Sequence, residues 1–228
     1  MTFAALRGLV VVTWRERLLK PLVGGLCLVV ALSQITTARL TGELQDPVLL
    51  LTLLIAGGSV GRDVTSGVLP LLFTRPLVRS HYVFAKWIAV GTAAAVLSVV
   101  TLVAEAVLLA RAGQGLAGGE IVDAIVKSMT TAFGISSVLV LFSVLASGFA
   151  DVLIWVGLNT LPLIAHKVIP QRMAEEWQAF LNPSLDWAAT VGPPASLFQP
   201  VSYLSTVALC LALAAIAINR KELSYASG

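Results

Sequence analysis

The chain has 228 residues, of which 57% are hydrophobic and only 12% are charged, and its mean hydropathy is +0.92. This composition excludes an ordinary soluble domain, because such domains carry about twice that share of charged residues. The net charge of +3 does not indicate a nucleic-acid-binding protein, since the basic residues flank apolar runs and form no single patch. The composition therefore predicts an all-α, polytopic membrane protein without a nucleic-acid partner.

Residues 1–20 predict an amphipathic helix at the N-terminus. Basic residues directly precede the first apolar run and no small-residue cleavage site follows it, so a cleavable signal peptide is not expected. The helix either lies in the membrane interface or forms the cytoplasmic end of the first span, and the sequence leaves both open. Its apolar residues recur every three or four positions, at Phe3, Leu6, Val10, Trp14 and Leu18.

Six apolar runs follow one another along the chain, and an α-helix needs about 20 apolar residues to cross a bilayer. They predict about six transmembrane helices in a single transmembrane domain that covers residues 1–228. In the second run, Pro47 lies near the start and Gly57-Gly58 near the end, so this run spans the membrane only by continuing toward Asp63. The runs are Leu22–Thr37, Leu44–Val60, Trp87–Ala110, Ile121–Ala146, Val152–Ile169 and Val201–Ile218.

The distribution of Lys and Arg predicts that both termini are cytoplasmic, because basic connections are retained on that side during insertion. In this orientation residues 61–86 form a cytosolic loop and residues 170–200 an external loop. The external loop is expected to contain a short helix with Met173 and Trp177 on one face, which Asn182-Pro183 ends. The cytosolic side receives 10 of the 15 basic residues: Arg7, Arg15, Arg17, Lys20, Arg62, Arg75, Arg79, Lys86, Arg220 and Lys221.

Two charged residues lie inside predicted spans. Glu105 is near the outer end of the third span and Lys127 near the outer start of the fourth, so an antiparallel hairpin brings them to a similar depth. A charge inside the membrane is costly unless it is paired or hydrated. We therefore predict an intramembrane ion pair between Glu105 and Lys127.

The segment from Gly61 to Trp87 reads GRDVTSGVLPLLFTRPLVRSHYVFAKW. It resembles the connection between the second and third spans of the permease subunits of type-2 ABC exporters. It departs from that pattern at Asp63, where Glu is usual, at Val68, where Thr is usual, and at Pro70, where an acidic residue is common. The residues that align with the pattern, including the substituted Asp63 and Val68, are Gly61, Arg62, Asp63, Gly67, Val68, Leu69, Leu71, Leu72, Arg75, Pro76, Arg79 and Lys86.

The resemblance implies that this segment couples the spans to an ABC ATPase. The residue types agree with that role, since Gly67 gives the backbone freedom before the leucines, and Pro76 separates them from a basic element with Arg75 and Arg79. A short amphipathic helix seated in a partner's groove transmits a rigid-body movement to the spans on either side.

The resemblance also implies the partners. The chain has no GxxxxGK[ST] motif, so we expect no cofactor and no catalytic residue here, with ATP bound and hydrolysed by a separate subunit. We expect two ATPase subunits, a second permease subunit, identical or different, membrane lipid around the spans, and an accessory extracytoplasmic protein if the complex transmits force. The plasma or inner membrane is the expected location. The substrate route is expected between the two permeases, where the small residues of Gly24-Gly25, Gly57-Gly58 and Ala93–Ala95 permit close helix approach.

Two other classes of protein are alternatives to the exporter. The adjacent Glu175 and Glu176 are similar to the glutamates of membrane-embedded CAAX-type proteases, but His81 and His166 fall on opposite sides of the predicted topology. A secondary transporter is expected to carry midplane charges or paired broken helices in two repeats, and neither pattern is evident. The sequence also contains no metal-ligand motif.

Overall fold

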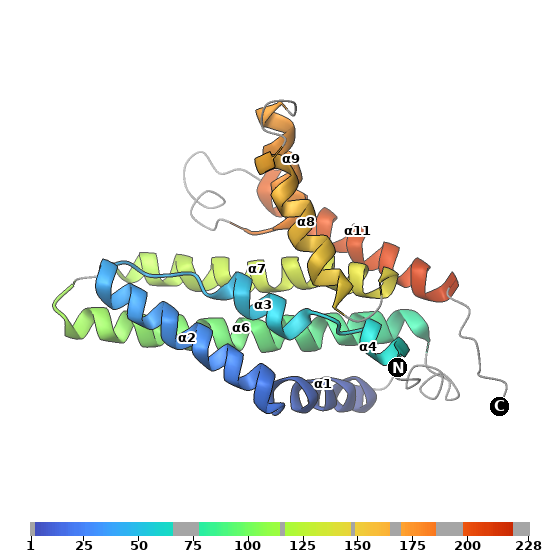
Figure 1. The fold of residues 1–228 in the computed structure, drawn as a ribbon, viewed down its shortest axis with the longest axis horizontal. Coiled ribbons are helices and arrows are strands. Elements are labelled where there is room, and N and C mark those ends of the chain that lie inside the picture. The colour runs from blue at the N-terminus through green and yellow to red at the C-terminus, as the bar shows by residue number, and fades with distance from the viewer. Residues whose placement is uncertain are drawn as a thin grey trace.

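The computed structural model describes residues 3–65, 78–114, 117–146, 149–164, 170–185 and 198–220. Every regular element in these ranges is a helix, as the composition predicts. The chain runs through α1 (Phe3–Leu18), α2 (Pro21–Thr41), α3 (Val48–Ala56), α4 (Gly61–Thr65), α6 (Arg79–Arg111), α7 (Gly118–Leu145), α8 (Ala150–Ile164), α9 (Gln171–Leu181) and α11 (Phe198–Arg220) (Figure 1).

Within the described ranges, four helices are long and apolar enough to cross a membrane: α2, α6, α7 and α11. They correspond to the first, third, fourth and sixth apolar runs of the sequence. The second and fifth runs contain shorter helices, since α3 has 9 residues and α8 has 15. The reason for the short α3 is visible in the sequence, because Pro47 precedes its first turn and Gly57-Gly58 follows its last.

The centre of the bundle is the antiparallel pair of α6 and α7. Within the most apolar stretch of each helix, 72% of the residues are buried in α7 and 17% in α2. Helix α7 is therefore central in the bundle and α2 is peripheral. Trp87 of α6 donates a hydrogen bond from its indole nitrogen to the carbonyl oxygen of Phe133 on α7, at 2.9 Å. The rings of the two residues also meet edge to face, with their centroids 5.5 Å apart.

The N-terminal segment is a helix of its own, separated from α2 at Leu19-Lys20. It packs on α6, where the indole nitrogen of Trp14 donates to the carbonyl oxygen of Ala89 at 2.8 Å. Arg17, which the sequence analysis counts among the cytosolic basic residues, has its side chain buried against the bundle. The segment is therefore not a continuation of the first long helix.

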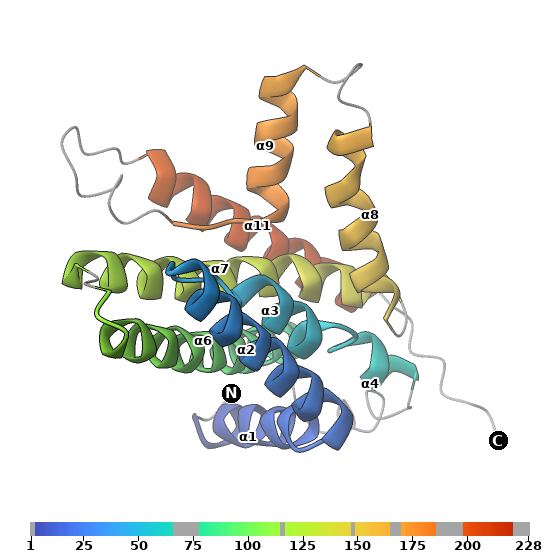
Figure 2. The ribbon, with the colours of Figure 1, turned by 60° about the vertical axis from the view of Figure 1, so that its left-hand side comes forward.

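Helix α8 leaves the bundle and α9 lies beside it, so that the two stand out from the other helices (Figures 1 and 2). Two tryptophans hold them together: Trp155 of α8 donates to the carbonyl oxygen of Leu181 at 3.1 Å, and Trp177 of α9 donates to that of Leu158 at 2.9 Å. The short helix that the sequence predicts before Asn182-Pro183 is thus present as α9.

Candidate functional site

The structure describes both ends of the predicted 61–86 loop. Its first residues form α4, and its last eight residues, 79–86, are already part of α6, so the helix begins before the predicted third run. Of the predicted coupling residues, the structure describes Gly61, Arg62, Asp63, Arg79 and Lys86. The other predicted coupling residues lie outside the described ranges: Gly67, Leu69, Leu71, Leu72, Arg75 and Pro76.

Residues 57–60, between α3 and α4, are not helical, and we call residues 57–63, which include the first three residues of α4, the junction. Gly58 has φ of +65°, a left-handed conformation that favours glycine. A helix that is interrupted inside a membrane protein exposes backbone groups that must find partners in the protein. In the junction some of these groups pair with side chains of other helices, whereas the N–H groups of Gly57 and Ser59 donate to carbonyl oxygens of α3.

Three helices supply the partners of the junction backbone. From α1, Arg17 donates a hydrogen bond from Nη1 to the carbonyl oxygen of Gly57 at 2.7 Å. From α8, Asp151 accepts the backbone N–H of Gly58 at 2.7 Å. From α7, the hydroxyl oxygen of Ser143 accepts the backbone N–H groups of Val60 and Gly61, both at 2.9 Å.

These partners are themselves buried and connected. Ser143 and Asp151 have no exposed surface, and Arg17 is only 5% exposed. Asp151 and Ser143 accept N–H groups of neighbouring junction residues, so α7 and α8 meet there. Asp151 in addition accepts the backbone N–H of Val152 at 2.8 Å.

The fourth contact comes from α6. The ammonium nitrogen of Lys86 lies 2.8 Å from Oδ2 of Asp63, and the two side chains are 6% and 16% exposed. The hydroxyl of Tyr82, one turn earlier on α6, donates to the same carboxylate oxygen. Asp63 and Lys86, which the sequence selected separately, are therefore brought together, and they join the two ends of the loop.

Two arginines of the loop contact neighbouring elements. The guanidinium of Arg62 lies 5.8 Å from the ring centroid of Phe149, just before α8, in a cation–π contact. Arg79 donates from Nη1 to the carbonyl oxygens of Ile218 and Asn219, at 3.3 and 3.2 Å. These carbonyls are at the C-terminal end of α11, where a cation is favoured by the helix dipole.

The charges around the junction are balanced. Arg17 and Lys86 are the buried cations, and Asp63 and Asp151 are the carboxylates that face the junction. Burial lowers the pKa of the Arg17 guanidinium, the nearby Arg62 lowers it further, and Asp63 and Asp151 act in the opposite direction. An arginine stays protonated in such a site, so Arg17 is a fixed positive charge beside the junction.

Sequence reasoning missed four members of this arrangement: Arg17, Tyr82, Ser143 and Asp151. One signal was available, because a span that is interrupted at Gly57-Gly58 requires polar partners from other helices. Asp151 stands immediately before an apolar run, and Ser143 lies inside one, so both were candidates for that role. Nothing in the sequence indicates which backbone groups they contact.

The predicted outer pair is arranged differently. Glu105 is fully buried and its Oε2 accepts the backbone N–H of Gln45 at 2.9 Å. Lys127 lines a cavity of about 430 Å³ near the N-terminal end of α7, together with Asp46 and Asp123. Among the described residues the ion pairs join Lys86 to Asp63 and Arg172 to Glu176, and none joins Glu105 to Lys127.

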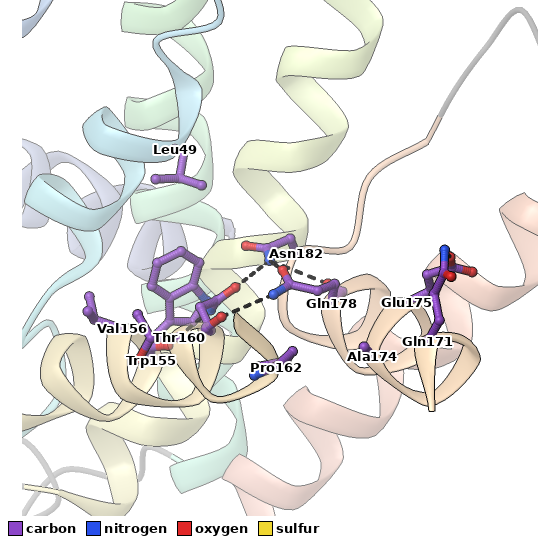
Figure 3. A pocket seen from close by; sticks show the side chains of 11 residues that line it. Leu49, Trp155, Val156, Thr160, Pro162, Gln171, Ala174, Glu175, Gln178 and Asn182 are labelled. Carbon is purple, nitrogen blue, oxygen red and sulfur yellow. Dashed lines mark hydrogen bonds between the residues drawn. The ribbon is translucent and has the colours of Figure 1, made fainter. Parts of the chain in front are cut away.

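A second cavity, of about 770 Å³, lies between α8 and α9 (Figure 3). Its polar groups are mostly carboxamides: Nδ2 of Asn182 donates to Oδ1 of Asn159 at 2.6 Å and to Oε1 of Gln178 at 3.1 Å. Glu175 and Glu176, the pair considered for a protease, are exposed on α9 and contact Gln171 and Arg172 of the same helix. This arrangement does not resemble a catalytic pair.

The four long apolar helices and the buried polar junction define a polytopic membrane protein with one interrupted helix whose ends are held by the rest of the bundle. The chain belongs to the family described as ABC-2 family transporter protein, whose family model matches residues 47–222. The matched region contains α3 to α11 and all of the junction. A search among curated proteins gave no match for this chain. The chain is thus a permease of the type-2 ABC class and a membrane component of a transporter.

Proposed function

We propose that this chain is the permease subunit of an ATP-driven exporter. In this proposal a separate ABC ATPase binds and hydrolyses ATP and contacts the 61–86 loop from the cytosol. A second permease subunit, identical or different, completes the membrane part, and the substrate route lies between the two permeases. The chain itself binds no cofactor, and its location is the plasma or inner membrane.

The proposal includes six spans with both termini in the cytosol. The second span is α3 continued through the junction into α4, and the fifth is α8 continued toward residue 169. The charges at the ends of the described helices support this orientation. In it, the cytosolic side of the membrane receives Arg15, Lys20, Arg79 and Arg220. Helix α9 and the residues that follow it then belong to the external side.

The observation that carries the proposal is the junction. It lies at the start of the segment that resembles a coupling loop, and its residues are held by side chains from α1, α6, α7 and α8. A movement of the loop therefore acts on four helices at once, through charged and hydrogen-bonded contacts that are buried. Such short contacts in a low-dielectric environment favour displacement of the connected helices together.

Copurification tests the partner. The tagged chain, isolated from its native membrane in mild detergent, should bring a stoichiometric ABC ATPase with it. L72S and R75Q should lower the amount of bound ATPase or abolish the stimulation of its activity, whereas R111Q, at the opposite end of α6, should change neither. Wild-type binding and stimulation in both loop variants would mean that the loop does not couple to the ATPase.

Thiol labelling tests the orientation independently. A single cysteine at position 75 should react with a membrane-impermeant maleimide only after the cells are opened, and a single cysteine at Arg172 on α9 should react in intact cells. Labelling of position 75 from outside would overturn the topology.

A further inference from the structure

Helix α8 contains a proline, Pro162, in its last turn. A proline has no backbone N–H, and its ring displaces the carbonyl group four residues earlier, so the carbonyl oxygen of Leu158 loses its partner within the helix. The indole nitrogen of Trp177, on α9, donates to this oxygen at 2.9 Å. Nε2 of Gln178 donates to the next carbonyl oxygen, that of Asn159, at 3.1 Å. Helix α9 thus replaces a hydrogen bond that the proline removes from α8.

The C-terminal end of α9 receives the same kind of bond from α8. The carbonyl groups in the last turn of a helix have no partner within that helix. Leu181 is the last residue of α9, and its carbonyl oxygen accepts a hydrogen bond from the indole nitrogen of Trp155 at 3.1 Å. Nδ2 of Asn182 donates to Oδ1 of Asn159 at 2.6 Å. We call these bonds between the two helices, donated by Trp155, Trp177, Gln178 and Asn182, the clasp.

Apart from the clasp, α9 is loosely packed. Leu181 is the one residue of α9 that is buried, and the large apolar side chains of Met173 and Trp177 are exposed. The two helices stand out from the rest of the bundle, and the cavity of about 770 Å³ lies between them (Figures 2 and 3). A segment that buries little apolar surface opens at a lower free energy than the core does.

The chain directly after α9 is fixed to α7. A Cβ added at Gly134 would collide with the carbonyl oxygen of Pro183, so the two backbones are in close contact. The backbone N–H of Leu185 donates to Oγ1 of Thr130 at 3.3 Å. Asn182, which follows the last turn of α9, has φ of −125° and ψ of 62°, outside the helical region. A movement of α9 relative to α7 is therefore concentrated at Asn182, since residues at the ends of elements absorb such changes.

We propose that α9 is a hinged lid on the cavity between α8 and α9, held closed by the clasp and opened when the clasp is released. The structure shows the closed position, in which α9 satisfies the carbonyl oxygen that Pro162 frees. Opening releases the carboxamides of Asn159, Gln178 and Asn182 from one another, so that the cavity wall gains free hydrogen-bonding groups. The inference does not depend on contact with an ATPase or on the side of the membrane where α9 lies.

Distances between spin labels on the two helices test the lid in the full chain, reconstituted in lipid nanodiscs. The labels are attached to cysteines at Leu161 and Met173, exposed positions of α8 and α9, after the two native cysteines are replaced by alanine. W177F keeps an aromatic ring but loses the donor, and it should raise the fraction of molecules with a longer distance several-fold. W14F is the matched control, because it removes an indole bond of the same kind, to the carbonyl oxygen of Ala89 on α6, and should leave the distances unchanged.

P162A provides a second measurement, because it restores the backbone N–H that bonds to the carbonyl oxygen of Leu158 within α8. P162A alone should raise the open fraction as W177F does, and W177F should add little to it. The proposal is overturned if W177F, as a folded and monodisperse protein, leaves the distances unchanged. It is also overturned if W177F has the same effect with and without P162A, because the indole would then not act through the carbonyl that the proline frees.

Discussion

Breaking the ion pair between Lys86 and Asp63 should destabilise the protein more than breaking an exposed ion pair does. The two charges are 2.8 Å apart and their side chains are 6% and 16% exposed, so little water is available to solvate Lys86 once its partner is neutral. Removing one member of a buried pair costs about 3–5 kcal/mol, because the other charge stays buried without compensation. D63N retains the shape of the side chain and an oxygen that accepts from Tyr82, so the lost charge is the main change.

The size of the coupling is best measured as a double-mutant cycle. D63N and K86M should each lower the free energy of unfolding, by about 3 kcal/mol at the lower end of that range. The double variant D63N/K86M removes both charges and should lose about 2 kcal/mol less than the sum of the two single variants, within the range found for contacting residues. The measurement is equilibrium unfolding of the purified protein in mixed micelles, followed by tryptophan fluorescence.

An internal control is available in Arg172 and Glu176, which form an ion pair of 3.2 Å on α9 with side chains 90% and 66% exposed. E176Q should cost at most about 0.5 kcal/mol, because exposed pairs of this kind are solvated in both states. If D63N costs no more than E176Q, or if the cycle gives no interaction energy, the buried charge balance at the junction is not what holds the loop to α6.

Three further results are expected. S143A leaves two backbone amides of the junction without an acceptor and should cost about 1–3 kcal/mol in the same unfolding assay, whereas S136A, which removes a buried hydroxyl with no hydrogen-bond partner in the structure, should cost little. G58A should destabilise by about 1–2 kcal/mol because of the positive φ, and G157A, which meets no atom within 4 Å, should not. Burial raises the pKa of Asp46, so its folded pKa lies above the unfolded value of about 3.9 and the fold favours the protonated carboxyl. The stability that the protonated Asp46 contributes is present below the unfolded pKa and is lost as the pH rises through the folded pKa. D46N, which stays neutral, should therefore be as stable as the wild type near pH 4 and more stable at pH 7. Equal stability of the two proteins at pH 7 would mean that burial does not raise the pKa of Asp46.

The long elements were predictable because hydrophobicity alone specifies them. Helices α2, α6, α7 and α11 are long and apolar enough to cross a bilayer, and each coincides with an apolar run of the sequence. The break after α3 was also indicated, since Pro47 and Gly57-Gly58 bracket a run too short to span by itself. Helix α6 begins eight residues before the predicted run, because residues 79–86, with Arg79 and Lys86 at their ends, are typical of a loop although they form the first turns of the helix.

The partners within the site were not predictable in the same way. Asp63 and Lys86 were selected from a family resemblance, yet their mutual contact depends on how α4 docks on α6. Arg17 read as a topology determinant, because composition does not distinguish a basic residue in the interface from one that reaches a backbone carbonyl 40 residues away. The same limit applies to Glu105, for which a charged partner was expected and a backbone amide was found.

The central claim is that a nucleotide-hydrolysing partner contacts the segment between α4 and α6. A photo-reactive amino acid at position 72, introduced in living cells and activated by light, tests it directly, with the exposed Leu40 at the far end of α2 as the control position. We predict that the adduct from position 72 contains an ABC ATPase and that the adduct from position 40 does not. The absence of any ATPase adduct at position 72, in a stably inserted protein, would contradict the account.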